Sequence, residues 1–281
     1  MIDQATELRK LVLQSARQHV AAAGPPPRLA VVTSGKGGVG VTTLAVNLSV
    51  ALAEQGSRVV VVDADLHRSD AATLCGLSEQ QSVADVVTAR RDIHEVLQRG
   101  PAGIQIVPGL AAPRQDGAWS EAAQERLLRQ FQMLGRHADV VVLDVGGGTN
   151  DFIRRCCEAA DDVLAVSTSD AVSVMDCYAR IKTSYSGQAA ATLWLVVNQC
   201  HGNAALDVHQ RIDQSCERFL GFRVEHWGAV PEDDAVVESV SSGVPFMLSA
   251  PSCPAALAVQ RLATELLAND RASSAQRREV G

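Results

Sequence analysis

Residues 29–43 read Leu29-Ala30-Val31-Val32-Thr33-Ser34-Gly35-Lys36-Gly37-Gly38-Val39-Gly40-Val41-Thr42-Thr43, and this stretch decides the fold of the chain. Its apolar, β-branched start predicts a buried strand over 29–33, and its glycines lead into a helix predicted from Leu44. Glycines let the backbone turn sharply and aim several N–H groups at one point, and the following helix adds its positive end. The pattern predicts an anion-binding loop, with the Thr42 hydroxyl placed to reach a bound Mg²⁺.

Outward from this loop, short apolar runs alternate with stretches long enough for a helix. The runs that predict strands cover 59–62, 104–107, 140–143, 163–167, 193–197 and 224–230. Strands that are apolar throughout and separated by helices indicate a parallel sheet covered on both faces. We therefore expect an α/β fold of three layers, with a mainly parallel central sheet and a last helix over Pro254–Leu267.

The composition narrows the classes of protein that fit. The chain has 281 residues, 47% of them hydrophobic, so it can bury a full core. Its formal net charge of −7 excludes a basic footprint over the whole chain. The seven cysteines form no Cys-x-x-Cys pair, which is typical of reduced thiols in a cytosol. No secretory signal and no apolar run of membrane-spanning length are visible, so we expect a cytoplasmic protein.

The chain divides into four predicted parts. Apolar residues at helical spacing predict an N-terminal helix within 1–20, and Pro25-Pro26-Pro27 makes 21–27 a stiff linker because three prolines cannot continue a helix. The main domain is predicted over 28–268. The polar segment 269–281 is predicted to be a disordered tail, and its lack of large apolar residues predicts weak or no membrane binding.

The loop resembles the deviant Walker A motif of the MinD/ParA family, whose pattern is GKGGxGK[ST]. The resemblance implies a P-loop NTPase of the SIMIBI class that binds ATP or ADP with Mg²⁺ and forms a homodimer on ATP binding. It implies that Lys36 is catalytic and reaches the nucleotide of the partner subunit. The nucleotide-binding residues that it implies are Gly35, Gly37, Gly38, Val39, Gly40, Val41, Thr42 and Thr43.

One position departs from the family pattern, because Val41 replaces the second lysine of the motif. That lysine places positive charge between the β- and γ-phosphates, where charge builds up in the transition state. Losing one charge-assisted contact costs about 1.5–3 kcal/mol, or roughly 10- to 150-fold in affinity. Binding can persist through backbone N–H groups, Thr42 and Mg²⁺, whereas ATP hydrolysis stays an open question.

Two further motifs supply acids at strand ends. Asp63-Ala64-Asp65 follows one predicted strand, and Asp144 directly follows the run 140–143. Both positions are at the carboxyl ends of strands, where ligands bind in open α/β folds. By resemblance, Asp65 is the catalytic residue beside the attacking water, and Asp144 is the Walker B carboxylate. The predicted Mg²⁺ ligands are Thr42, Asp63 and Asp144. The family usually continues past Asp144 with a proline, which Val145-Gly146-Gly147-Gly148 lacks, so a more flexible loop is expected.

The predicted base-binding residues lie further along the chain. Asn198 ends a strand, and its amide can both donate and accept, which matches the adenine-reading residue of the family. Pro231 follows the strand run 224–230 and is assigned to the nucleotide as well. The segment Ser242-Gly243-Val244-Pro245 matches the part of the family that closes over the base.

Two segments resemble the FlhG subfamily in particular. Asp3-Gln4-Ala5, with Leu8 after it, resembles the DQA-containing helix that activates the SIMIBI GTPase FlhF, and 173–182 resembles the S-x-x-D-A-Y-A-x-I-K helix of FlhG. The resemblance implies a regulator of flagellar number or placement. Its partner-binding residues would be Asp3, Gln4, Ala5 and Leu8, and its partners an FlhF-like GTPase and flagellar basal-body (C-ring) proteins.

Two other functions stay open from the sequence. In the first, Val41 abolishes turnover and the chain is a pseudo-ATPase scaffold whose N-terminal helix carries the output. In the second, the chain is a ParA- or MinD-type ATPase that positions chromosomes or the division site. The absence of a long basic extension argues against direct DNA binding.

Overall fold

The computed structural model describes residues 25–65, 68–78, 81–110, 119–147, 150–185 and 191–279. The predicted N-terminal helix lies outside these described residues. The strands are β1 (Arg28–Ser34), β2 (Val59–Asp63), β3 (Gln98–Arg99), β4 (Gln105–Val107), β5 (Val140–Gly147), β6 (Asp162–Ser167), β7 (Thr192–Asn198) and β8 (Glu225–Val230). The α-helices are α2 (Val41–Glu54), α3 (Val83–Val87), α4 (Glu121–Gln132), α5 (Asp151–Ala159), α6 (Ala171–Ser184), α7 (Ala204–Leu220), α8 (Asp234–Ser242), α9 (Phe246–Ser249) and α10 (Pro254–Glu279).

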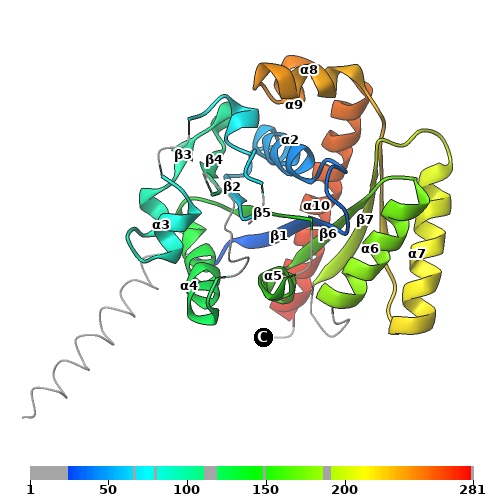
Figure 1. The fold of residues 1–281 in the computed structure, drawn as a ribbon, viewed down its shortest axis with the longest axis horizontal. Coiled ribbons are helices and arrows are strands. Elements are labelled where there is room, and N and C mark those ends of the chain that lie inside the picture. Colours follow the sequence, from blue (N-terminus) through cyan, green and yellow to red (C-terminus); the bar gives the residue numbers. More distant parts are fainter. Residues whose placement is uncertain are drawn as a thin grey trace, which may run out of the picture.

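One central sheet runs through the molecule in the order β3-β4-β2-β5-β1-β6-β7-β8 (Figure 1). The pairings among these strands are parallel, except that β3 runs antiparallel to β4 at one edge. The chain passes from β1 outward to β2, and after β5 it crosses β1 to form β6 on the other side. The carboxyl ends of β1, β5 and β6 therefore surround a topological switch point, where open α/β sheets bind their ligands.

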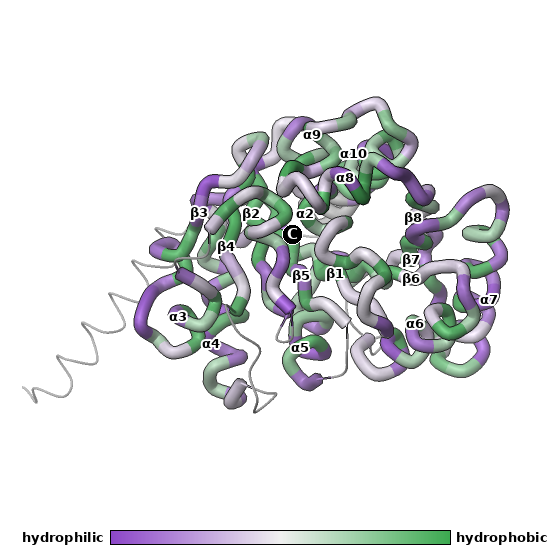
Figure 2. The backbone as a smooth tube through the Cα atoms, turned by 45° about the horizontal axis from the view of Figure 1, so that its top comes forward, coloured by the Kyte–Doolittle hydropathy of each residue, from purple (hydrophilic) through white to green (hydrophobic). Residues whose placement is uncertain are grey.

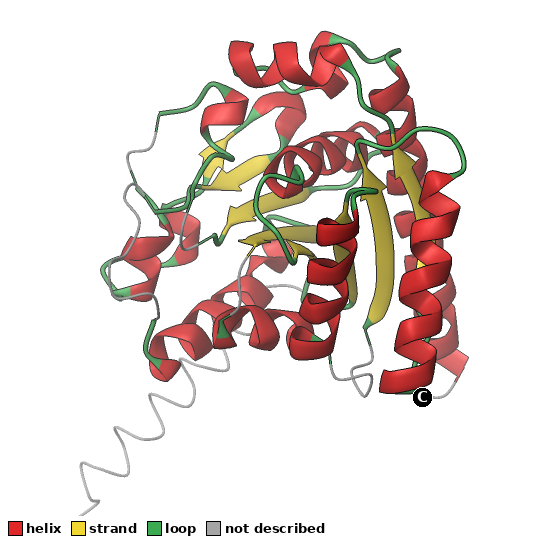
Figure 3. Cartoon of the chain, turned by 45° about the vertical axis from the view of Figure 1, so that its right-hand side comes forward, coloured by secondary structure: helices red, strands yellow, loops and turns green. Residues whose placement is uncertain are grey.

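Helices cover both faces of this sheet, which confirms the predicted three-layer α/β fold (Figure 3). Helices α2 and α10 pack against each other on one face, and α3, α4, α5, α6 and α7 pack on the other. Along β1, Leu29 and Val31 face the second group, whereas Ala30 and Val32 face α2 and α10. Because both faces are buried, the strands read as unbroken apolar runs.

The hydropathy of the chain follows these layers (Figure 2). Strands β2, β4 and β5 and helix α2 are drawn mainly in the colour of apolar residues, and α4 and α7 alternate between apolar and polar. Such alternation is typical of a helix with one buried face. All seven cysteines are free thiols. Within the described part of the chain, no helix is both long and apolar enough to cross a bilayer.

Three element boundaries differ from the sequence-based prediction. Helix α2 begins at Val41 rather than Leu44, because Gly40 in the left-handed region supplies the turn into the helix. Strand β3 was not predicted, since two polar residues at a sheet edge carry no hydrophobic pattern. Helix α10 continues past the predicted end at Leu267 to Glu279, through residues that include no proline or glycine to end it.

Candidate functional site

The loop between β1 and α2 forms one wall of a cleft of about 950 Å³. Gly38 and Gly40 have φ values of +83° and +90°, which glycine adopts without strain. Gly40 is the N-cap of α2, and no side chain caps this helix end. The first N–H groups of α2 are therefore left for an anion, as the sequence predicted.

Two elements distant in sequence press directly on this loop. A Cβ at Gly35 would lie 1.9 Å from the backbone oxygen of Asp176 in α6, and a Cβ at Gly40 would lie 2.4 Å from Asn198 Nδ2. The Asn198 amide also donates a 2.8 Å hydrogen bond to the Val39 carbonyl oxygen. The loop is thus held between α6 and the end of β7, and its glycines are required by close packing as well as by φ.

Val41 occupies the first helical position of α2 and lines the cleft. Its side chain is 7% exposed and belongs to the apolar cluster on the α2 and α10 side of the sheet. The place of the usual lysine is therefore apolar, so this position contributes its backbone N–H to the loop but no charge.

Thr42 lines the cleft, and its hydroxyl lies beside Asp144 of β5. Asp144 is fully buried, and its Oδ1 accepts a 3.0 Å hydrogen bond from the Gly146 N–H. Its Oδ2 is buried with no hydrogen-bond partner among the described residues. Burial raises the pKa of Asp144 to about 6, and the nearby Thr42 hydroxyl offsets part of that rise. A buried carboxylate oxygen without a partner, beside a hydroxyl, fits a hydrated divalent cation.

The two aspartates after β2 have different surroundings. Asp63 is fully buried and accepts hydrogen bonds from Ser69 Oγ (3.0 Å) and the Ala71 N–H (3.1 Å), so it organises its own loop. Burial, and then the charge of Asp144, raise the pKa of Asp63 to about 8. Asp65, in contrast, lines the cleft.

The glycines after Asp144 pack closely against two other loops of the site. Gly146 has a φ of +63°, and a Cβ on it would lie 2.0 Å from Asp65 Oδ2. A Cβ at Gly147 would lie 3.1 Å from the Gly37 N atom. This turn packs against both the Asp65 loop and the glycine loop. Because the approach is so close, these positions require glycine.

Lys36 does not line the cleft. Its Nζ lies 3.7 Å from Asp170 Oδ1, at the start of α6, and both side chains are nearly half exposed. An exposed ion pair of this kind is weak, so the lysine can leave it at little cost.

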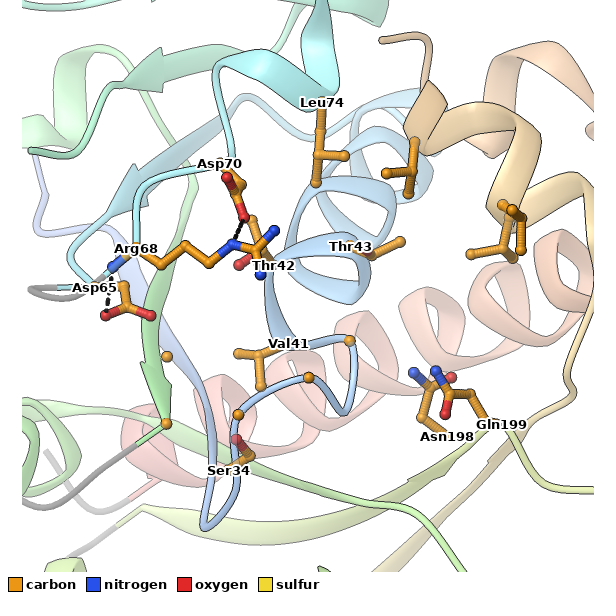
Figure 4. A pocket seen from close by; sticks show the side chains of 18 of the residues that line it. Ser34, Val41, Thr42, Thr43, Asp65, Arg68, Asp70, Leu74, Asn198 and Gln199 are labelled. Carbon is orange, nitrogen blue, oxygen red and sulfur yellow. Dashed lines mark hydrogen bonds and ion pairs between the residues drawn. The ribbon is translucent and has the colours of Figure 1, made fainter. Parts of the chain in front are cut away.

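The far end of the cleft is lined by Asn198, Gln199 and residues from Pro231 onward (Figure 4). The sequence predicted Asn198 and Pro231 here. The predicted cover, 242–245, is not among the lining residues. The apolar side chains that line this end of the cleft are instead Val236, Val237 and Val240 of α8. The helix was missed because its valines at helical spacing have no counterpart in the motif.

Sequence reasoning also missed Arg68 and Asp70, which line the cleft beside Thr42. They form an ion pair with each other. A signal was present in the run Arg68-Ser69-Asp70, which begins three residues after Asp65, but nothing local indicates which of these side chains turn toward the loop. The predicted partner-binding residues Asp3, Gln4, Ala5 and Leu8 lie outside the described residues and stay predictions.

An uncapped helix end behind a glycine loop, an orphan carboxylate beside a threonine and an amide at the opposite end define a P-loop nucleotide-binding protein. The family described as "ParA: NUBPL iron-transfer P-loop NTPase" matches residues 27–267. The chain belongs to the MinD/ParA family of deviant Walker A ATPases.

Individual relatives agree with this assignment. The chain is 30% identical to the antiactivator FleN of Pseudomonas aeruginosa, over 86% of each chain. It is 26% identical to the septum site-determining protein MinD of Bacillus subtilis, over 84% of this chain and 88% of that one. The structure of the cell division ATPase MinD from Pyrococcus furiosus has the same fold, with a TM-score of 0.72 at 22% identity over 85% of this chain and 98% of that chain.

One solved relative bears on the ligand. The septum site-determining protein MinD of Pyrococcus horikoshii, in complex with Mg-ADP, superposes with a TM-score of 0.70 at 23% identity over 85% of this chain and 96% of that one. The relative therefore binds the magnesium nucleotide on this fold.

Proposed function

We propose that this chain is an FlhG-like nucleotide switch that binds ATP with Mg²⁺ in the cleft and regulates flagellar number or placement. The observation that carries the proposal is an uncapped helix N-terminus at the cleft, whose first turn places Thr42 beside Asp144, and the buried Oδ2 of Asp144 has no hydrogen-bond partner among the described residues. The likeness to the antiactivator FleN supports the flagellar role.

In this proposal the phosphates lie against the N–H groups of the glycine loop and the first turn of α2. Thr42 and Asp144 would hold Mg²⁺, which offsets phosphate charge when bound. Asp63 supports the loop behind them, and its part in ion binding stays a prediction. Asp65 would orient the attacking water from its place in the cleft wall. Asn198 would read the adenine, and the valines of α8 would cover the base.

Dimerisation on ATP binding is part of the proposal, and the position of Lys36 supports it. Its ammonium lies outside the cleft of its own subunit, in a weak pair with Asp170. We assign it to the nucleotide of a partner subunit, since leaving an exposed pair for a phosphate is favourable. ATP would thereby join two copies of the chain.

The output of the switch is assigned to the segment that contains Asp3, Gln4, Ala5 and Leu8. This segment would stimulate an FlhF-like GTPase, where a glutamine can orient water or a phosphate contact. Basal-body proteins are a second class of proposed partner.

A pseudo-ATPase scaffold is the second candidate function. The observation that favours it is the burial of Val41 among apolar side chains, which leaves the transition-state charge without its usual lysine. Iron transfer, which the family description names, is not proposed. The sequence contains no Cys-x-x-Cys pair, and the described residues contain no group of three or more potential metal ligands. The residues therefore give no support for iron transfer.

Calorimetric titration of the full-length chain with ATP and Mg²⁺, followed by sedimentation, tests the nucleotide switch. We expect binding well below about 1 mM and a shift from monomer to dimer. A Lys36→Ala variant should bind ATP but remain monomeric. Absence of ATP binding at about 1 mM would refute the switch and leave the scaffold. Val41→Lys should raise turnover and change the output only if the chain is a switch.

The output is tested by GTP hydrolysis of an FlhF-like GTPase in the presence of the full-length chain. We expect stimulation, and we expect Gln4→Ala to remove most of it. Gln14→Ala, in the same predicted helix, is the matched control and should stimulate normally. Equal stimulation by the two variants would remove Gln4 from the proposed role.

A further inference from the structure

The charged side chains that line the cleft are mostly acidic, which does not suit a negatively charged nucleoside triphosphate. Four acidic side chains line it: Asp65, Asp70, Glu232 and Asp233. Val41 brings no charge to the loop, and Lys36 is not part of the lining. Among the described residues that line the cleft, Arg68 is the one cationic side chain.

Arg68 stands at the phosphate end of the cleft. In Figure 4 its guanidinium lies beside Asp70 and Thr42, while Asn198 lies at the opposite end. The Arg68 backbone N–H donates a 3.3 Å hydrogen bond to Asp65 Oδ1, which ties the residue to the cleft wall. A nucleotide that directs its base to Asn198 and its phosphates to the glycine loop would pass its terminal phosphates in front of this guanidinium.

The side chain is also free to change partner. It is 79% exposed, and the carboxylate with which it pairs, Asp70, is itself partly exposed. Exposed ion pairs contribute little free energy, so exchange of Asp70 for a phosphate is favourable. The planar guanidinium can contact two phosphate oxygens at once, which gives a stronger interaction than a neutral hydrogen bond.

We propose that Arg68 provides, from the loop after β2, the cationic phosphate contact that the glycine loop lacks at Val41. This inference rests on the proposed binding of ATP. Before the nucleotide arrives, Asp70 holds the guanidinium at the cleft mouth. When ATP is present, Arg68 binds the β- or γ-phosphate from the loop after β2. The charge lost from the loop is thereby replaced from a different element of the fold.

The test is a double-mutant cycle on ATP affinity with the full-length chain, measured by calorimetry in the presence of Mg²⁺. Arg68→Gln should weaken ATP binding about 10-fold or more, the loss expected for one charge-assisted contact. In a Val41→Lys background the same change should cost less than about 3-fold, because the restored lysine takes over the contact. Adenosine binding should be unchanged by Arg68→Gln.

Arg129→Gln is the matched control. Arg129 is an exposed arginine of α4 paired with Glu125, and it does not line the cleft. It should leave ATP affinity unchanged. If wild-type protein binds ATP and Arg68→Gln binds it equally well, the inference fails and the proposed function stands. A loss of equal size in both backgrounds would show that Arg68 does not replace the lysine. If wild-type protein binds no ATP, both proposals fail.

Discussion

The two ends of β5 place the same residue type in opposite electrostatic situations. Asp139, directly before the strand, is half exposed and pairs with Arg58 at 2.6 Å. The hydrogen bond from Arg58 lowers the pKa of Asp139. Asp144, toward the other end, is fully buried, and burial raises its pKa to about 6. The carboxylate before β5 is therefore compensated by a cation, whereas the buried carboxylate near its carboxyl end is not.

A similar contrast between paired and unpaired polar groups is seen for two arginines: Arg28, the first residue of β1, and Arg180 of α6, which bonds to the last residue of β1. At the amino end, Arg28 Nε lies 2.5 Å from Asp162 Oδ2, and Trp194 Nε1 donates to Asp162 Oδ1 at 2.9 Å. At the carboxyl end, Arg180 Nε donates to the Ser34 carbonyl oxygen at 3.0 Å, but its buried Nη2 has no partner among the described residues. The comparison shows that paired charges at the amino ends of the strands stabilise the sheet. At the carboxyl ends, where a ligand is expected, some buried polar groups have no partner among the described residues.

The largest loss of stability is expected from removing the ion pair between Arg28 and Asp162 at the amino end of β1. Arg28→Met leaves Asp162 buried without its cation, which costs about 3–5 kcal/mol of unfolding free energy. Urea denaturation monitored by circular dichroism measures the loss. A change below about 1 kcal/mol would mean that Trp194 and the backbone already compensate Asp162.

At the carboxyl edge, Gly35→Ala would drive a methyl group into the backbone of α6, since its Cβ lies 1.9 Å from Asp176 O. We expect a loss of about 1–3 kcal/mol in stability and weaker ATP binding as the loop shifts. Gly37→Ala is the control for stability, because no atom lies within 4 Å of its Cβ. Thermal melts should separate the two variants, and equal melting temperatures would contradict the packing argument.

The carboxyl edge should also give the nucleotide-free protein an unusual pH dependence. Because the folded pKa of Asp144 lies above its ordinary value of 3.8, the folded state binds this proton more tightly than the unfolded state does. Stability should therefore fall as the pH rises from about 4 to 6, and Asp63 should extend the fall toward 8. Asp144→Asn should reduce this slope and raise stability at pH 8 on the order of 1 kcal/mol.

Asp139→Asn, directly before the same strand, is the matched control, and the expected change in stability at neutral pH has the opposite sign. A lowered pKa adds stability above the ordinary pKa of 3.8, so removing the charge should destabilise the protein at neutral pH. Urea denaturation of both variants at pH 5 and pH 8 compares the two ends of β5 directly. If Asp144→Asn lost stability at pH 8, the contrast between the ends would be wrong.

The smallest effect is expected for Arg58→Gln. Arg58 and Asp139 are both about half exposed, and water screens such pairs, so the pair contributes about 0.2–1 kcal/mol. High salt should reduce the difference between variant and wild type further. A loss comparable to that of Arg28→Met would show that the hydrogen bonds from Arg58 to backbone carbonyls dominate at this edge.

Prediction from the sequence succeeded where neighbours in sequence are also neighbours in space. The strand, loop and helix over 29–54 depend on local glycines and apolar runs, and the acids at the ends of β2 and β5 follow from strand ends. Prediction did not find the valines of α8 in the lining of the cleft, and 242–245, predicted to close over the base, are not part of that lining. It also missed β3 and the end of α10, where local polarity hides the packing.

The sequence by itself determined the α/β fold, the anion-binding loop and the loss of its lysine, because each depends on residue type at a fixed local spacing. Only the tertiary structure decided which distant side chains meet that loop. Asn198 meets Val39, and Asp176 meets Gly35, across separate elements, and Arg68 and Thr42 come from separate elements to line one cleft. Such contacts depend on how strands and helices pack, and that packing is a property of the whole chain rather than of any one segment.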